Sequence, residues 1–461
     1  MPDISGPNSR GRCSLRRRII PTHMVSVFRR PRSTARERNA SIAAMDVLAA
    51  LSAALAALRA GRIDDARRAG ERIWRQSSDA RAAGFLALLE TDAGRYDSAL
   101  LWNDRARQSN PSDPRFALQG ARVAGLMGDH VAAFDRLAAL LRDAPRTKGA
   151  WSEFATVART CDRRAEAVAA CIRAYDAEPT LVYALNALLH LISDEPQGEA
   201  APAAVPTSAR RPLSLVTCSN DDTQFAAMAA SYDRALPDWP HDIVRIADAT
   251  SLAEGYTRGV AVATGEIVIF SHDDVEILAG DFGHRLSRRL AECDVLGVAG
   301  ATRATGPAWP FAGSPFLHGS VIYPDETGYR VTVYSRNVPL ARDIRVMDGV
   351  FLAMRREVAL RIGWDAEACD GFHGYDVDFT LRAAQAGLRL AVASDLGVVH
   401  RSYGSFDTRW EATVRKLVAR HPELNGERSK ETGFVARSVP DAAHAMALVD
   451  NWARMGKASF P

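Results

Sequence analysis

The sequence predicts two domains of different class: an all-α helical repeat domain, followed by an α/β domain with a mostly parallel sheet. Three observations support this prediction. In the first half of the chain, turn residues, small residues and prolines recur every 33 or 34 positions. Residues 193–212 then contain several prolines and no periodicity. From residue 213 onward, short β-branched runs alternate with helical stretches.

Length and composition are those of a globular protein with more than one domain. The chain has 461 residues, of which 47% are hydrophobic and 25% are charged. Ten arginines and two acidic residues give residues 1–40 a charge of +8, so the remainder carries 3 − 8 = −5. A mildly acidic remainder offers no broad basic face, and we therefore expect no nucleic-acid partner.

Residues 1–45 form an arginine-rich start with three interpretations: a disordered arm, a tail that binds a membrane or polyanion, or an overlong, non-native start. We favour the last, because Met24 and Met45 lie just before the first helical stretch. The segment lacks the apolar core of a secretory signal, and no apolar run approaches a membrane span. Six cysteines without metal-like spacing are typical of reduced thiols. We expect a cytoplasmic protein, at most peripheral at the inner face of the membrane.

Three kinds of marker define the repeat over residues 46–192. The first helix of each pair would end at Gly61, Gly94, Gly128 and Asp162. An alanine follows each of these five residues later, at Ala66, Ala99, Ala133 and Ala167, and prolines recur at Pro111, Pro145 and Pro179. Gly or Asp breaks the helix, Ala lets the second helix approach closely, and Pro ends it.

This pattern resembles the tetratricopeptide repeat, which implies an array (a solenoid) of antiparallel helix pairs. Such arrays offer a concave surface that binds peptides or partner proteins. A spacer or a dimerisation platform is the alternative role.

The chain changes character after the expected linker, residues 193–212. Its next elements are expected as strands at 213–219, 242–248 and 266–271 and helices at 223–236 and 251–263. This β-α-β-α-β order implies a parallel sheet with right-handed crossovers. The first strand is followed by Thr217-Cys-Ser-Asn220 instead of a G-x-G-x-x-G or Walker A motif, which disfavours dehydrogenase and P-loop chemistry.

The segment Ser271-His-Asp-Asp-Val275 directly follows the third of these strands. In open α/β sheets, ligands bind outside the carboxyl ends of the strands. Carboxylates at that place can hold a divalent cation against a nucleotide diphosphate. The segment therefore indicates a metal or phosphate site.

Residues 213–425 resemble a GT-A glycosyltransferase of the family 2 type, a fold with a Rossmann-like α/β sheet. The motifs that carry the resemblance occur in the expected order: Leu215–Asn220, Ile246–Asp248, Ser251–Gly265, His272–Val275, Met347–Arg355, His373–Arg382 and Gly397–Ser402. The chain departs from the family at three positions. Thr257 stands where many relatives carry Asn, His272 replaces the first Asp of D-x-D, and Tyr375 replaces a Glu.

The resemblance implies a role for each part of the site. Metal ligands for Mn²⁺ or Mg²⁺ would be Asp274 and His400, and the general base would be Asp376, with Asp378 as its rival. Of these two carboxylates, one would otherwise cap the helix and the other would pair with Arg382. Contacts to the nucleotide would come from Thr217, Ser219, Asn220, Asp248, His272 and Asp273. The acceptor side would include Asp348, Gly349 and Trp309.

The activity implied is transfer of a sugar from a nucleotide-sugar donor, UDP-linked, with inversion at the anomeric carbon. The acceptor would be a glycan, a lipid-linked saccharide or a protein, and the repeat array would recruit the acceptor or a partner protein. The alternative is a non-catalytic repeat scaffold whose sugar-nucleotide domain has decayed. Aromatic residues between 306 and 334 are expected in loops over the acceptor side or, alternatively, in the core of an antiparallel excursion. Residues 426–461 are expected to form a polar tail.

Overall fold

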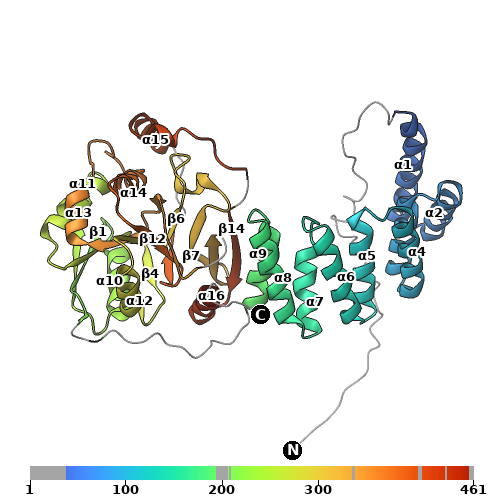
Figure 1. Cartoon of the computed structure of the whole chain (residues 1–461), viewed down its shortest axis with the longest axis horizontal. Helices are drawn as coiled ribbons and strands as arrows, with labels where there is room; N and C mark the ends of the chain where they lie inside the picture. Colours follow the sequence, from blue (N-terminus) through green and yellow to red (C-terminus); the bar gives the residue numbers. More distant parts are fainter. Residues whose placement is uncertain are drawn as a thin grey trace, which may run out of the picture. The chain divides into compact units, whose positions relative to one another are not determined.

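The computed structural model describes residues 38–193, 206, 209–334, 338–402, 408–430 and 433–455 (Figure 1). The expected arginine-rich start up to residue 37 and most of the expected linker lie outside the described residues. Contacts divide the chain into a unit that ends at Arg136 and a second that begins at Leu137. Within the described residues, no helix is long and apolar enough to cross a membrane.

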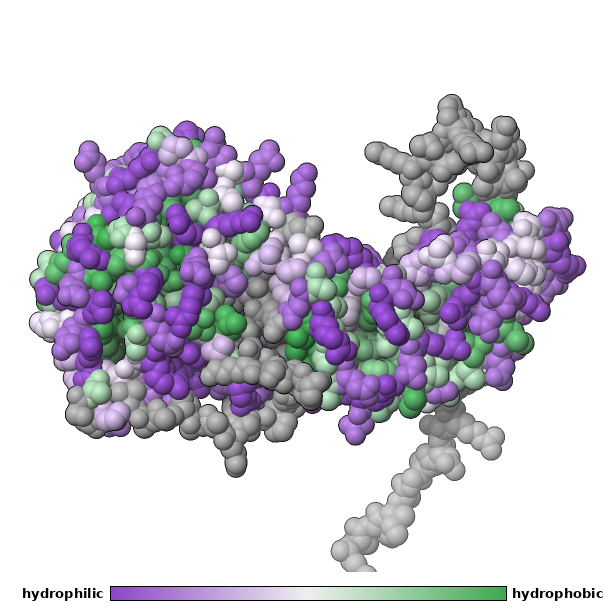
Figure 2. Space-filling view, in the orientation of Figure 1, coloured by the Kyte–Doolittle hydropathy of each residue, from purple (hydrophilic) through white to green (hydrophobic). Residues whose placement is uncertain are grey.

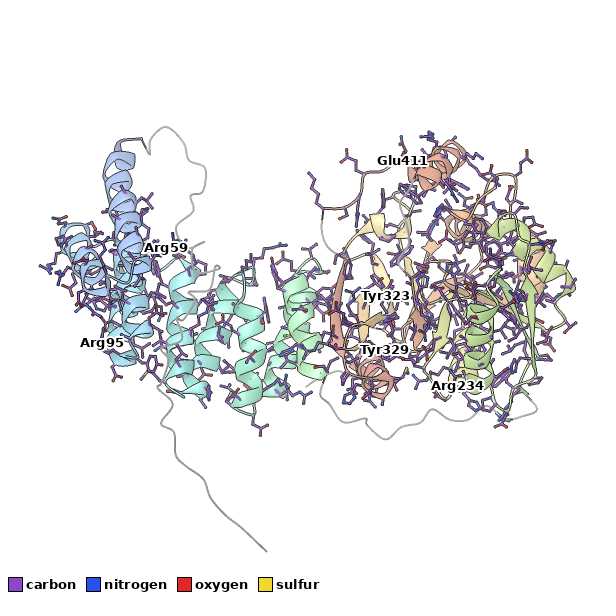
Figure 3. The ribbon with its side chains drawn as sticks, turned by 180° about the vertical axis from the view of Figure 1, so that it is seen from behind. Arg59, Arg95, Arg234, Tyr323, Tyr329 and Glu411 are labelled. Atoms are coloured by element: carbon purple, nitrogen blue, oxygen red, sulfur yellow. The ribbon has the colours of Figure 1, made fainter. Side chains whose placement is uncertain are left out.

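The first unit consists of helices joined by short turns. They are α1 (Arg38–Arg59), α2 (Ile63–Ser77), α3 (Ala80–Asp92), α4 (Tyr96–Ser109), α5 (Pro114–Leu126) and the start of α6 (His130–Asp143). Helix α1 therefore begins eight residues before residue 46, where the array was expected to start. Arg59 and Arg95, labelled in Figure 3, stand at the end of α1 and just before α4.

The repeat markers have the conformations that the sequence predicts. The turn residues all lie in the left-handed region, with φ of 77° at Gly61, 72° at Gly94, 85° at Gly128 and 57° at Asp162. The four alanines are fully buried. Glycine suits the first three turns because, without a Cβ, its backbone adopts a positive φ at no steric cost, and a short Asp is among the few residues that replace it. The prediction of a helical repeat is confirmed.

The second unit begins with the remainder of α6 and three more helices, α7 (Ala150–Thr160), α8 (Arg164–Ala177) and α9 (Val182–Ile192). Helix α9 packs against strand β14 (Phe434–Val439) and helix α16 (Ala442–Met455). Asn451 Nδ2 donates to the carbonyl of Ile192 at 3.2 Å, across this contact. The last helices of the array are thus part of the same compact unit as the sheets that follow.

Within the described residues, one sheet of seven strands has the order β2-β1-β3-β11-β5-β12-β9. Its strands are β1 (Leu213–Cys218), β2 (His241–Ile246), β3 (Ile267–Ser271), β5 (Val295–Gly297), β9 (Leu340–Ala341), β11 (Phe351–Arg355) and β12 (Leu390–Ala393). Strand β1 is parallel to both β2 and β3, with α10 (Asp222–Ala235) and α11 (Leu252–Val262) as the crossovers. Strands β11 and β9 run against the other five. The prediction of an α/β domain is confirmed. Five of the seven strands share one direction, but the sheet is mixed, because three of its six pairings are antiparallel.

A second sheet has the order β10-β6-β7-β13-β4. Its strands are β4 (Val275–Ile277), β6 (Ala299–Ala301), β7 (Leu317–Asp325), β10 (Val346–Met347) and β13 (Val398–His400). Strand β8 (Gly328–Tyr334) forms an antiparallel hairpin with β7 and also pairs with β14. Tyr323 and Tyr329, labelled in Figure 3, lie on this hairpin. The antiparallel alternative therefore describes most of the aromatic segment.

The expectation of a tail after residue 425 needs correction, because β14 and α16 lie within that stretch. In α16 the buried residues Ala445, Leu448, Val449 and Trp452 recur at intervals of three and four. This pattern is visible in the sequence and indicates an amphipathic helix. Residues 456–461 lie outside the described residues.

On the face drawn in Figure 2, hydrophilic residues predominate and hydrophobic residues form smaller groups.

The left-handed turns give a test of the repeat. We expect Gly94→Ala to lower the free energy of unfolding by about 1 kcal/mol, because alanine resists a positive φ. A Cβ at Gly94 meets nothing within 4 Å, so the backbone alone carries the cost. Gly125, within α5, is the control: its Cβ would make ordinary contact with Ala133, and Gly125→Ala should stabilise by about 0.5 kcal/mol. Chemical denaturation measures both, and equal effects would contradict the assignment.

Candidate active site

The segment that follows β3 crosses from one sheet to the other. Strand β3 ends at Ser271, and β4, which belongs to the second sheet, begins at Val275. Strand β13 runs antiparallel to β4, with His400 opposite Val275. The backbone N–H of Arg401 donates to the carbonyl of Asp274 at 3.2 Å. This pairing brings His400 beside a segment that is about 125 positions away in the sequence.

Three side chains converge at this crossing. His400 Nε2 lies 3.5 Å from Asp274 Oδ1 and 3.4 Å from His272 Nδ1, and His272 Nδ1 lies 4.0 Å from Asp274 Oδ1. Asp274 and His400 are each only 8% exposed. Ligands that share one cation at bonds of about 2.1 Å are themselves about 3.0 to 3.5 Å apart. Two of the three separations fall in this range, and the donor set fits a divalent cation, with His272 as a third candidate ligand beside the expected pair.

His272 is held through its other ring nitrogen. Its Nε2 and the hydroxyl of Tyr375 share a hydrogen bond of 2.6 Å. Burial, reinforced by the neighbouring His400, lowers the pKa of His272. A lowered pKa keeps the imidazole neutral at physiological pH, which is the form that binds metals. Sequence reasoning noted Tyr375 only as a replacement for Glu, and nothing in the sequence indicates its contact with His272.

Asp376 lies in the first turn of helix α14 (Tyr375–Gln385). Its carboxylate accepts hydrogen bonds from the backbone N–H of Gly349 at 3.0 Å and of Val377 at 2.9 Å. Burial and the nearby carboxylate of Asp348 nevertheless raise the pKa of Asp376 to about 7. A carboxylate with a pKa near the working pH is suited to accept a proton in catalysis.

The three expected acceptor-side residues lie together beside Asp376. Trp309 Nε1 donates to Asp348 Oδ2 at 2.9 Å, and the N–H of Val350 donates to Asp348 Oδ1 at 2.9 Å. The indole of Trp309 is 7% exposed and packs edge-on against Tyr334 at 4.8 Å. Trp309 therefore fixes Asp348 in place and offers no open ring face for stacking on a sugar.

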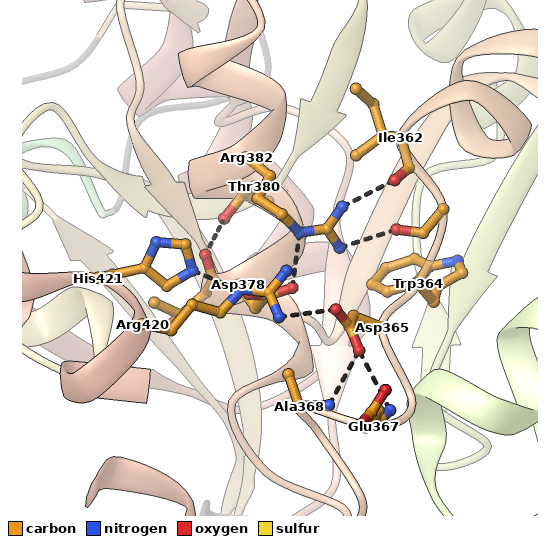
Figure 4. Close-up of polar contacts among 12 residues, drawn as sticks. Ile362, Trp364, Asp365, Glu367, Ala368, Asp378, Thr380, Arg382, Arg420 and His421 are labelled. Carbon is orange, nitrogen blue, oxygen red and sulfur yellow. Dashed lines mark hydrogen bonds and ion pairs between the residues drawn. The ribbon is translucent and has the colours of Figure 1, made fainter. Parts of the chain in front are cut away.

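Asp378, the rival base, is surrounded by two arginines and a histidine (Figure 4). Its carboxylate is 2.8 Å from Arg382 Nε, 3.1 Å from Arg420 Nε and 2.9 Å from His421 Nε2, and the residue is 1% exposed. Arg382 also donates to the carbonyls of Ile362 and Gly363 at 2.7 and 2.8 Å. This network ties α14 to the ends of α13 (Arg356–Ile362) and α15 (Thr408–Arg420). The geometry of Asp378 matches the ion pair with Arg382 that was weighed as its alternative role.

Of the six expected nucleotide contacts, two are buried, two are exposed, and His272 and Asp273 are partly exposed. Thr217 and Ser219 are buried at the end of β1, and Ser219 Oγ donates to the carbonyl of Asp221 at 3.1 Å. Asn220 is exposed. The side chain of Asp248 is 81% exposed, and a hydrogen bond from Arg258 at 2.9 Å lowers the pKa of Asp248.

Two residues that sequence reasoning missed order the same edge of the sheet. Gln224 Nε2 donates to Asp273 Oδ1 at 2.7 Å. Arg245 Nε donates to the carbonyl of Ser219 at 3.0 Å, and its guanidinium lies 4.6 Å from the centre of the Phe225 ring. Arg245 stands opposite Thr217 in the pairing of β2 with β1, which is a signal that only the strand register provides.

The second half of the chain is thus an α/β domain with imidazole and carboxylate groups clustered at its strand ends, and it is similar to a known family. Residues 214–421 match the sequence model of a glycosyltransferase-like family. No curated protein matches the chain.

Solved structures resemble the helical part of the chain. MamA of Desulfovibrio magneticus is 16% identical, with 32% of this chain and 82% of that one covered and a TM-score of 0.26. The Yersinia enterocolitica translocator chaperone SycD is 19% identical, with coverages of 24% and 83% and a TM-score of 0.23. A mutant of the Thermobaculum terrenum O-GlcNAc transferase is 17% identical, with coverages of 47% and 39% and a TM-score of 0.25.

The raised pKa of Asp376 predicts a dependence of stability on pH. The folded chain holds this proton more tightly than the unfolded chain, so stability is lost as pH rises from about 4 through 7. The shift from 3.8 to about 7 corresponds to about 4 kcal/mol. We expect Asp376→Asn to stabilise by about half of that at pH 8, because asparagine accepts only one of the two amide bonds. Melting temperatures in metal-free buffer at pH 5 and pH 8 measure the effect.

Asp365 is a matched control for this experiment. Its pKa is lowered by the backbone N–H of Ala368 and by Arg420, which lies 2.7 Å from Asp365 Oδ2. Asp365→Asn should therefore destabilise at pH 8, which is the opposite sign. A destabilised Asp376→Asn at pH 8 would show that the carboxylate of Asp376 is not strained by burial.

Proposed function

We propose that the protein is a glycosyltransferase that moves a sugar from a UDP-linked donor to the hydroxyl of a glycan, a lipid-linked saccharide or a protein. One observation carries the proposal beyond the family match. Tyr375, the neighbour of the candidate base Asp376, is hydrogen-bonded to His272 in the candidate metal cluster. A proton acceptor and a cation site therefore belong to one site, as transfer from a nucleotide sugar requires.

A divalent cation would be held by His272, Asp274 and His400. When bound, it would stabilise the negative charge that develops on the leaving diphosphate. Mg²⁺ prefers oxygen ligands, whereas imidazole nitrogens favour transition metals. Of the two cations expected from the sequence, this donor set favours Mn²⁺.

Asp376 is the proposed general base in a single displacement. Its carboxylate takes the proton of the acceptor hydroxyl, whose oxygen forms the new bond to the anomeric carbon as the bond from that carbon to the diphosphate breaks. One attack from the opposite face inverts the anomeric configuration. Asp378 is engaged by Arg382, Arg420 and His421, which supports a positioning role for it and leaves Asp376 as the base.

The remaining polar residues at the strand ends would contact the nucleotide. Asp248 projects its carboxylate into solvent beyond β2, where it can accept a hydrogen bond from the N–H of uracil. Asn220 and Asp273 would contact the ribose or diphosphate together with Ser219, whereas Thr217 is buried in β1 and would line the floor. The repeat array would bring the acceptor or a partner protein to the site.

Substitution of the base tests this mechanism. We expect Asp376→Asn to reduce transfer at least 100-fold, the loss typical of a missing general base, while UDP binding measured by calorimetry stays within twofold. Asp370→Asn is the control, because Asp370 is an exposed carboxylate that pairs with Lys416 at 2.6 Å. Normal turnover by Asp376→Asn would reject the assignment, and a product that retains the donor's anomeric configuration would reject a single displacement.

The carboxylate of Asp348 provides a second test through pH. Because Asp376 must be deprotonated to act, kcat/KM should rise with pH through an apparent pKa near 7. Removing the neighbouring negative charge in Asp348→Asn should lower the pKa of Asp376 and move this rise to lower pH. If the rise in kcat/KM stays at the same pH, the charge of Asp348 does not affect the titrating group.

If no sugar nucleotide stabilises the protein with or without Mn²⁺, the scaffold alternative is favoured.

A further inference from the structure

The side chain of Tyr375 is held in place by the aromatic rings that pack around it. The residue is 4% exposed, and its ring lies 5.7 Å from that of Tyr256 and 5.9 Å from that of Trp364. Its hydroxyl passes over Gly349, where a Cβ would lie 2.2 Å from the Tyr375 oxygen. The surrounding aromatic side chains and the absence of a side chain at Gly349 together determine where the hydroxyl lies. It does not depend on His272 for its place.

The bond between Tyr375 and His272 has a consequence for the opposite ring nitrogen. A neutral imidazole carries its proton on one nitrogen and a lone pair on the other, and the partner of one nitrogen selects which. If Nε2–H donates to the Tyr375 oxygen, Nδ1 keeps its lone pair. Nδ1 is the atom that lies 3.4 Å from His400 Nε2 and 4.0 Å from Asp274 Oδ1. When the Tyr375 oxygen accepts from Nε2–H, the lone pair of His272 Nδ1 is therefore available as a third ligand atom beside Asp274 and His400.

We propose that Tyr375 is a positioning residue that accepts a hydrogen bond from His272 Nε2 and so aims Nδ1, with Asp274 and His400, at a transition-metal dication such as Mn²⁺. This inference rests on the proposed function, because it assumes that the cluster holds a cation. It gives a role to the tyrosine found in place of the family's glutamate, and it places that residue next to Asp376 in the first turn of α14. Outer partners of metal-bound histidines typically contribute 10- to 100-fold to metal affinity.

Tyr375→Phe tests this role, because it removes the hydroxyl and keeps the ring in its packed site. We expect Mn²⁺ alone, titrated into the full chain and followed by electron paramagnetic resonance, to bind 10- to 100-fold more weakly. Tyr256→Phe is the matched control: Tyr256 is a fully buried neighbour whose hydroxyl has no hydrogen-bond partner among the described residues. Its Mn²⁺ affinity should equal that of the wild type.

A double-mutant cycle separates positioning from a general structural effect. If Tyr375 acts through His272, Tyr375→Phe should change Mn²⁺ affinity less than twofold when His272 is already alanine. Equal Mn²⁺ affinity of wild type and Tyr375→Phe would overturn this inference and leave the proposed function standing. A wild-type protein that binds no Mn²⁺ would overturn the metal site and this inference together. A loss that persists in full beside His272→Ala would show that Tyr375 acts by another route.

Discussion

The short antiparallel pairing between β13 and β4 is the constraint on which the candidate site depends. It sets Val398 opposite Ile277 and His400 opposite Val275, so the imidazole arrives beside Asp274 only in this register. A shift by one residue would turn His400 to the other face of the sheet. Because β4 directly continues the segment that leaves β3, the same pairing also determines where the two sheets meet.

Helix α14 provides the other half of the site and is anchored through Asp378, at the end of its first turn. Asp378 collects Arg382, Arg420 and His421 around one buried carboxylate, which holds the helix against the neighbouring segments. A buried charge is costly to leave without a partner, so the two guanidinium groups, the imidazole and the carboxylate constrain one another. The start of the same helix carries Tyr375 and Asp376, the proposed positioning residue and the proposed general base.

Local patterns predicted most of the fold, and long-range pairings account for what they missed. Gly61, Gly94, Gly128 and Asp162 revealed the repeat because a left-handed turn restricts the residue type at each of them. Asp274 and His400 were predicted from motifs that follow strands. His272 was predicted as a nucleotide contact. Its contact with His400 and its hydrogen bond to Tyr375 were not predicted, because they join segments that are far apart in the sequence. The insertion of β11 between β3 and β5, against the direction of both, is likewise a tertiary feature that no local period reveals.

The packing of α9 against β14 covers an apolar helix surface on one side and an edge strand on the other. Helix arrays need a cap where their last apolar surface would meet water, and α9 is apolar on nearly all sides. Sheets in turn need protection where a strand has no further neighbour, and among the described strands β14 pairs with β8 alone. The sheet thus closes the end of the solenoid, and the solenoid shields the border of the sheet. Because this contact is made by residues outside the linker, a cut in the linker would leave α9 packed against β14 and α16 instead of releasing two independent domains.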